Sequence, residues 1–199
     1  GSRIPEGVYY NLVNQVNNNV DVMKEYFKLL KDESGIKDFK YYDSYISISS
    51  LDKKFDYETQ FAIVKDALAV LGDEYVSLLD KAYNERWIDV YPSDTKSSGG
   101  YQFGSYDTHP YIFLNNTDDY NSMSTLAHEA GHAMHSYYSN HNQPYETSGY
   151  AIYVAEVAST VNEILLNKYM LENSKDIDDK IYYLDRYIKN IKSTVFRQT

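Results

Sequence analysis

Hydrophobic side chains recur three and four positions apart along most of the chain, which is the spacing of one face of an α-helix. Asp56 and Gly72 flank one such window, as is typical of a helix start and stop. The windows predict helices at about Glu6–Leu30, between Asp56 and Gly72, through Tyr75–Ala82 to near Trp87, at about 118–138, at about 150–171, and from Asp178 to Thr199.

Shorter patterns predict a small β-sheet. Tyr101–Tyr106 alternates between the two faces of a strand, and Pro110–Asn115 is a compact apolar run. Tyr42–Ser49 is consistent with either a short strand or an extended connector. Polar, turn-rich breaks separate these elements at Lys31–Asp38, Tyr91–Gly100 and Ser139–Gly149. The pattern therefore predicts a mainly α protein with a small β-sheet.

Composition narrows the function classes. The 199 residues are 43% hydrophobic, enough for one sizeable core, so residues 4–199 are expected to form a single domain. A net charge of −10 disfavours nonspecific nucleic-acid binding and binding to anionic membranes, and no apolar run approaches the length of a membrane span. With no cysteine, any metal must be held by His, Asp or Glu.

Both ends of the sequence suggest a fragment. Gly1 and Ser2 replace an initiator Met, so residues 1–3 are expected to be a tag remnant. The last helical pattern reaches Thr199 without the Gly, Asn or Pro that usually ends a helix. We therefore expect that the chain is cut from a longer polypeptide, whose remainder is missing.

The helix at 118–138 contains the sequence HEAGH. His128 and His132 project within about 40° of each other and one turn apart, at a separation that suits metal chelation. Glu129 is rotated by about 100°, which keeps it off the metal and close enough to accept a proton from an activated water. Two surface histidines of no special role are the alternative interpretation.

A zinc site needs a third protein ligand. The HExxHxxGxxH plan is excluded because residues 135 and 138 are His and Tyr. Glu146, Glu156 and Glu163 remain. Glu146 lies in a turn-rich loop, whereas an unpaired carboxylate at Glu156 would be costly among its apolar neighbours. The prediction is therefore Glu156.

Glu163 and His135 each allow two interpretations. Glu163 lies about 10 Å along the helix from Glu156, so the two carboxylates cannot hold one ion. Glu163 either orients a ligand His through its other ring nitrogen or is a helix-surface carboxylate. His135 is equally distant from His128, and either contacts substrate or hydrogen-bonds in the core.

A glycine-rich strand precedes the metal helix. Gly100, Tyr101 and Gln102 could pair backbone to backbone with an extended peptide, or belong to a hairpin of no special role. His109 and His141 are interpreted as structural loop residues.

Several segments together resemble a known family. They are HEAGHAMH at His128–His135, AEVASTVNE at Ala155–Glu163, and WIDVYPSDTKSSGGYQFG from Trp87 with the HPYIFLN segment after it. The stretch Tyr57–Tyr75 is also similar. They resemble the thimet-oligopeptidase-like zinc metallopeptidases, and within them the oligoendopeptidase F group.

The resemblance implies a zincin-like, mostly helical catalytic domain around a substrate channel. It implies one Zn²⁺ per chain, held by His128, His132 and Glu156, with Glu129 as general base and acid. It also implies cytoplasmic hydrolysis of short oligopeptides. Family members are longer and carry a downstream His and Tyr segment that stabilises the oxyanion, whereas no histidine follows His141 here.

Three functions are therefore compared. The first is a zinc endopeptidase that cleaves short peptides. The second is a zinc- or peptide-binding fragment without catalysis, because the oxyanion segment is missing. The third is a helical interaction domain in which HEAGH is incidental, and this one predicts no stoichiometric zinc.

Overall fold

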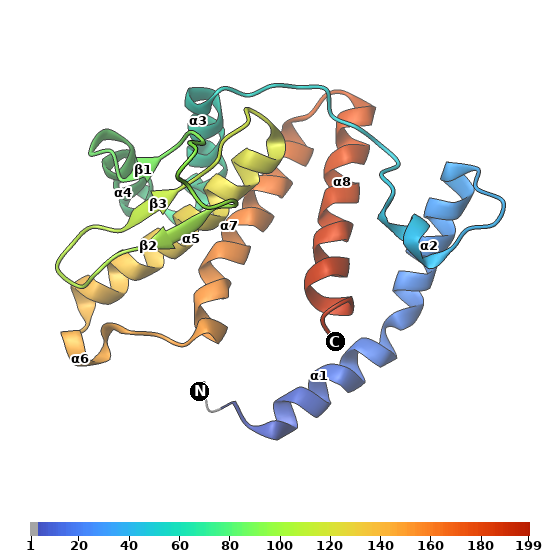
Figure 1. Ribbon diagram of the computed structural model, residues 1–199, viewed down its shortest axis with the longest axis horizontal. Helices are drawn as coiled ribbons and strands as arrows, with labels where there is room; N and C mark the ends of the chain where they lie inside the picture. Colours follow the sequence, from blue (N-terminus) through green and yellow to red (C-terminus); the bar gives the residue numbers. More distant parts are fainter. Residues whose placement is uncertain (1–3) are drawn as a thin grey trace. The chain divides into compact units, whose positions relative to one another are not determined.

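The computed structural model describes residues 4–199, so the expected tag remnant lies outside the described residues. These residues are mainly helical with one small sheet, which confirms the predicted fold class (Figure 1). They divide into two compact units, one formed by Asp52–Glu172 and the other by residues up to Leu51 together with Asn173–Thr199. That residues 4–199 act as one catalytic-domain fragment stays a prediction. Within residues 4–199, no helix is both long and apolar enough to cross a membrane.

The unit built from the two ends of the chain is helical. Its elements are α1 (Glu6–Asn18), α2 (Val20–Ser34), the 3₁₀ helix η1 (Tyr41–Tyr45), α8 (Ile177–Ile191) and the π-helical turn η3 (Lys192–Phe196). Met23, Tyr26 and Leu30 form its buried centre. The Tyr26 hydroxyl donates to the buried Asp185 carboxylate at 2.8 Å, which ties α2 to α8.

Several predicted boundaries in this unit are wrong. The single helix predicted at about Glu6–Leu30 breaks at Asn19, whose side chain donates to the Gln15 carbonyl and competes with the helical hydrogen bonds. The second helix then continues to Ser34, so the polar break begins later. The segment expected to be a strand or connector starts as η1, where the Asp43 side chain accepts the Lys40 amide.

The C-terminal helix also differs from the prediction. Regular α-helix ends at Ile191 rather than at Thr199, and the chain continues through the wider turn of η3. Lys192, at the start of that turn, is buried and donates to the backbone carbonyl of Ser44.

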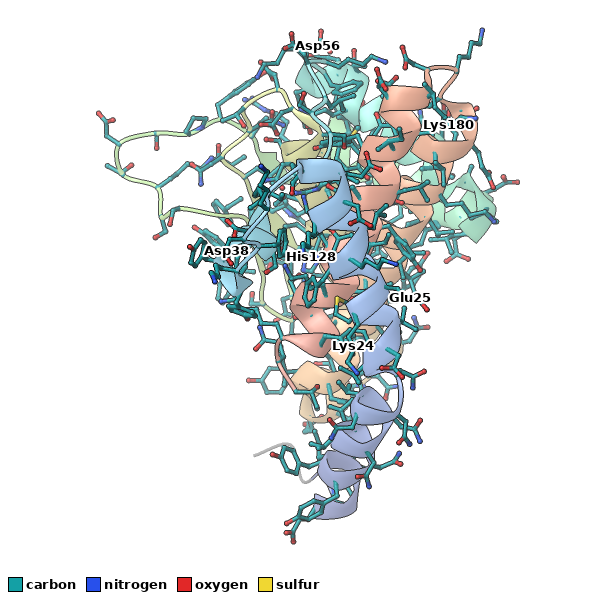
Figure 2. The ribbon with its side chains drawn as sticks, turned by 90° about the vertical axis from the view of Figure 1, so that its right-hand side faces the viewer. Lys24, Glu25, Asp38, Asp56, His128 and Lys180 are labelled. Atoms are coloured by element: carbon teal, nitrogen blue, oxygen red, sulfur yellow. The ribbon has the colours of Figure 1, made fainter. Side chains whose placement is uncertain are left out.

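The second unit holds the sheet and the longest helices. Its elements are α3 (Tyr57–Leu68), η2 (Ala69–Leu71), α4 (Asp73–Asn84), β1 (Ile88–Asp89), β2 (Tyr101–Phe103), β3 (Tyr111–Phe113), α5 (Tyr120–Asn142), α6 (Tyr145–Ser148) and α7 (Ile152–Asn173). Asp56, labelled in Figure 2, accepts the Thr59 amide at 2.9 Å and caps α3 as predicted. The helix expected to end near Trp87 ends at Asn84.

The sheet has the order β1-β3-β2, with β2 antiparallel and β1 parallel to β3. Both predicted strands are confirmed, whereas β1 was not predicted because it is only two residues long. The sheet packs on α5 (Figure 1). Ile112 is buried on the face toward α5, and Tyr101 stacks on Phe113 on the opposite face. As the last strand in the order, β2 has one backbone edge that no strand of this sheet pairs.

Candidate metal centre

The helix α5 carries the histidine pair. It begins where the Asp119 side chain accepts the Ser122 amide at 2.8 Å, and it runs to Asn142, four residues beyond the predicted end. One side of α5 is fully buried through Met123, Leu126, Ala127, Ala130, Ala133 and Met134. This stripe fixes the rotation of the helix, so His128 (labelled in Figure 2) and His132 project together beside α7.

Three candidate ligand atoms converge between α5 and α7. The Nε2 atoms of His128 and His132 lie 3.1 Å apart, and Glu156 Oε2 lies 3.6 Å from each. Nitrogen and oxygen ligands of a tetrahedral zinc ion, at about 2.0–2.2 Å from the metal, lie about 3.3–3.6 Å from one another. The triangle therefore fits a zinc ion, and it is the one such group of His, Asp or Glu found within residues 4–199.

Hydrogen bonds orient two of these ligands. Glu163 Oε1 lies 2.7 Å from His128 Nδ1, which keeps the proton on Nδ1 and the lone pair on Nε2, toward the other ligands. The Ser159 hydroxyl donates to Glu156 Oε2 at 3.0 Å. Both partners come from α7, so this helix supplies a ligand and also positions a histidine of α5.

The two histidines have opposite pKa shifts. Burial lowers the pKa of His128, but the hydrogen bond and charge of Glu163, with the nearby charges of Glu129 and Glu156, outweigh it and raise the pKa. Burial and the neighbouring His128 lower the pKa of His132. A metal bound to Nε2 would displace any proton held there, so metal affinity falls as pH falls.

Glu129 is buried on α5 and lies against the glycine-rich strand. Burial raises the pKa of Glu129. The charge of His128 lowers this pKa, whereas the charges of Glu156 and Glu163 raise it further. A Cβ atom at Gly100 would lie 3.3 Å from Glu129 Cγ and 2.5 Å from Thr125 Cγ2. The backbone at residue 100 can lie this close to the Glu129 side chain only because glycine has no side chain.

Gly131, at the centre of HEAGH, sets the distance between α5 and α7. A Cβ atom there would lie 2.6 Å from Ser159 Cα and 2.7 Å from the Ala158 carbonyl oxygen. This close approach of the two backbones brings the carboxylates of α7 within reach of the histidines. The sequence analysis gave Gly131 no role, although a glycine inside a strongly helical pattern is a signal of close packing.

Asn162 is a second residue that the sequence analysis missed. Its side-chain amide donates to the Ala127 carbonyl of α5 at 3.0 Å and to the Tyr75 hydroxyl of α4 at 2.9 Å. It is 1% exposed, so these bonds are shielded from water. Asn162 therefore joins three helices one turn from Ser159.

The remaining candidates lie outside the metal group. His135 stacks on Tyr150 with ring centroids 3.9 Å apart, and burial lowers its pKa. Its Nδ1 is buried and has no hydrogen-bond partner among residues 4–199. Glu146 lies in α6 and is not part of the ligand triangle. His109 stacks on Trp87. His141, expected in a loop, lies in the last turn of α5.

Comparison with known proteins shows the family of the chain. The family model described as Peptidase family M3 matches residues 2–199. Oligopeptidase PepF of Bacillus subtilis (strain 168) is 41% identical over 98% of this chain and 29% of its own length. An oligoendopeptidase F homolog of Lactococcus lactis subsp. lactis (strain IL1403) is 39% identical over 98% of this chain and 33% of its own length.

A solved structure is similar to the chain in fold. The crystal structure of a Chlamydophila abortus protein superposes with a TM-score of 0.91 and 39% identity, covering 99% of this chain and 33% of that one. The chain spans about a third of the length of the curated relatives it matches.

Proposed function

The chain belongs to Peptidase family M3, and from this premise we propose that its natural polypeptide is a zinc-dependent endopeptidase that hydrolyses short oligopeptides. The observation that carries the proposal is the convergence of His128, His132 and Glu156 beside the buried carboxyl group of Glu129. The proposal includes the cytoplasm as the place of action, as the family resemblance implies.

Each residue then has a definite task. His128, His132 and Glu156 would hold a zinc ion, which would supply Lewis acidity toward water and a peptide carbonyl group. Glu129 accepts the proton of the attacking water and delivers it to the leaving amine. The edge strand β2, with Gly100 packed against Glu129, hydrogen-bonds the backbone of an extended peptide and holds its scissile bond near the base.

Replacing Glu129 with Gln in the natural polypeptide tests the role of the base. Because Gln cannot accept the proton, we expect kcat for a quenched fluorescent peptide to fall about 100- to 10,000-fold, while one zinc ion per chain remains in elemental analysis. Glu172→Gln, a change of an exposed carboxylate on α7, is the control and should leave kcat unchanged. Turnover of Glu129→Gln close to that of the wild type would exclude the proposed role.

A second candidate is zinc and peptide binding without efficient catalysis by these 199 residues alone. It is favoured by the absence of any histidine after His141, since the family resemblance implies a later His and Tyr segment for the oxyanion. Removing oxyanion donors costs about 100- to 1000-fold in rate. Turnover of the 199-residue chain, compared with that of the natural polypeptide at equal zinc content, separates the two candidates.

A further inference from the structure

A cavity of about 460 Å³ lies between β2, the C-terminal half of α5 and the segment around α6. Gln102, Ser136 and Asn140 give it a polar side, and Tyr106 and Tyr145 give it an aromatic side. None of these residues belongs to the metal group or to the proposed base. The cavity is large enough for one bulky side chain.

The cavity lies along the path of a peptide on β2. Gly100 packs against Glu129, and two residues later Gln102 accepts a hydrogen bond from Ser136 Oγ at 3.2 Å, so β2 runs alongside α5 (Figure 1). Ser136 lies seven positions after Glu129 on the helix, a rise of about 10 Å. An extended peptide covers that distance in about three residues.

The direction of the peptide follows from strand pairing. The chain passes along β2 from Gly100, which precedes the strand beside Glu129, to Gly104, which follows it and lines the cavity. Antiparallel pairing is slightly more stable per residue than parallel pairing. A peptide antiparallel to β2 therefore has its N-terminal part over the cavity and its scissile bond near Glu129.

The lining favours an aromatic, uncharged side chain. It contains no Lys, Arg, Asp, Glu or His, so a charged side chain would lose water without gaining a counter-ion. The rings of Tyr106 and Tyr145 meet edge to face, 5.5 Å between centroids, and a third ring can extend this arrangement. The hydroxyl oxygens of Ser136 and Tyr150, 2.6 Å apart, can each accept a hydrogen bond from a phenol.

We infer that this cavity is a specificity subsite that selects a large aromatic side chain three residues N-terminal to the scissile bond. The inference rests on the proposed peptidase function, because the bound peptide is the substrate of that site. Gln102 positions the peptide through β2, and the Tyr106 and Tyr145 rings contact the selected side chain.

Peptide binding to the zinc-loaded Glu129→Gln form of the natural polypeptide tests the subsite without turnover. In fluorescence anisotropy, a peptide with Tyr three residues before the expected cleavage point should bind about tenfold tighter than the same peptide with Lys there. The same substitution three residues after that point should change affinity less than about twofold.

Two matched pairs of variants locate the preference. Gly149 lines the cavity, and a Cβ atom there meets nothing within 4 Å, so the backbone accepts a side chain at this position. We expect the ring of Gly149→Phe to occupy the cavity and to abolish the preference for Tyr. Thr147→Phe adds the same bulk outside the lining and should preserve it. Asn140→Asp should reverse the preference toward Lys, whereas Asn142→Asp, with the same charge change outside the lining, should not.

The outcomes separate this inference from the function on which it rests. Equal binding of the Tyr and Lys peptides, or a preference that survives Gly149→Phe, overturns the subsite even if the wild type cleaves both peptides. A preference on the C-terminal side of the bond overturns it as well. Absence of cleavage by the wild type, with the preference for Tyr intact, contradicts the peptidase proposal and supports the subsite as a peptide-binding pocket.

Discussion

At the scale of single residues, the site is defined by hydrogen bonds that sequence spacing cannot assign. Spacing placed Glu163 two turns from Glu156 on one face of a helix, but left it either as a partner of a ligand His or as a surface carboxylate. The structure places Glu163 Oε1 at 2.7 Å from His128 Nδ1. Which histidine it meets depends on the packing of α7 against α5, and that packing is not a local property of the sequence.

Glu163→Gln should weaken zinc binding by about 10- to 100-fold. Gln keeps a hydrogen-bond acceptor near His128 Nδ1 but removes the charge that makes this ring a better donor to a metal. Glu163→Ala removes both and should weaken binding further. Competition with a chromophoric zinc chelator measures the affinity. The control is Glu172→Gln on the same helix, and equal affinities of Glu163→Gln and this control would contradict the prediction.

At the scale of elements, long periodic segments were predictable and short ones were not. The burial stripe of α5 is visible as a 3.6-residue period, so the existence of the metal helix followed from sequence. The two-residue strand β1 exists because the backbone amides of Ile112 and Leu114 donate to the carbonyls of Trp87 and Asp89. This pairing between distant segments produces no pattern in the sequence around β1. The break at Asn19 and the single turn of α6 are also too short to produce a periodic pattern in the sequence.

Gly131→Ala should disrupt the contact between α5 and α7. The added methyl group would lie 2.6 Å from Ser159 Cα, so the two helices must separate, at a cost of about 1–3 kcal/mol in the free energy of unfolding. Separation also moves Glu156 away from the histidines, so zinc affinity should fall in the same variant. Chemical denaturation and chelator competition measure the two effects.

The control for this change is Gly7→Ala. Gly7 is also helical, but a Cβ atom there meets nothing within 4 Å, so the substitution should be neutral or stabilise the protein by up to about 1 kcal/mol. A loss of stability in Gly7→Ala as large as that in Gly131→Ala would show that the close packing at residue 131 is not the cause.

At the scale of the whole chain, the two compact units were not predictable. Length and hydrophobic content indicated one domain, which stays a prediction. Residues 4–51 form a compact unit with the last 27 residues, from Asn173 to Thr199. The hydrogen bond between Tyr26 and Asp185 joins positions 159 residues apart. Such a pairing depends on the path of the whole chain, whereas the resemblance carried by HEAGHAMH is local and is confirmed by the relatives.

Buried tyrosines in both units should make the protein unfold at high pH. Burial raises the pKa of Tyr75 to about 12, and burial with the hydrogen bond to Asp185 raises the pKa of Tyr26. Above about pH 10 the unfolded chain loses phenolic protons that the folded chain retains, so stability falls as pH rises. Below that pH both states hold these protons and the contribution is constant.

Absorbance of the phenolate group during alkaline titration tests this expectation. Part of the signal from the 23 tyrosines should appear late, together with the loss of helical circular dichroism. Tyr26→Phe and Tyr75→Phe should each reduce this late part. Complete ionisation before any loss of helix would be incompatible with the buried environment of these rings.

The candidate ligands all come from α5 and α7, and this affects when the metal site can form during synthesis of the chain. His128 and the positioning Glu163 are 35 positions apart, so every proposed donor comes from one short stretch of chain. The entropy of loop closure is small over such a distance, and metal binding is coupled to the folding of the groups that hold the ion. We therefore expect that a nascent chain can acquire its zinc once α5 and α7 have left the ribosome, before α8 has been synthesised.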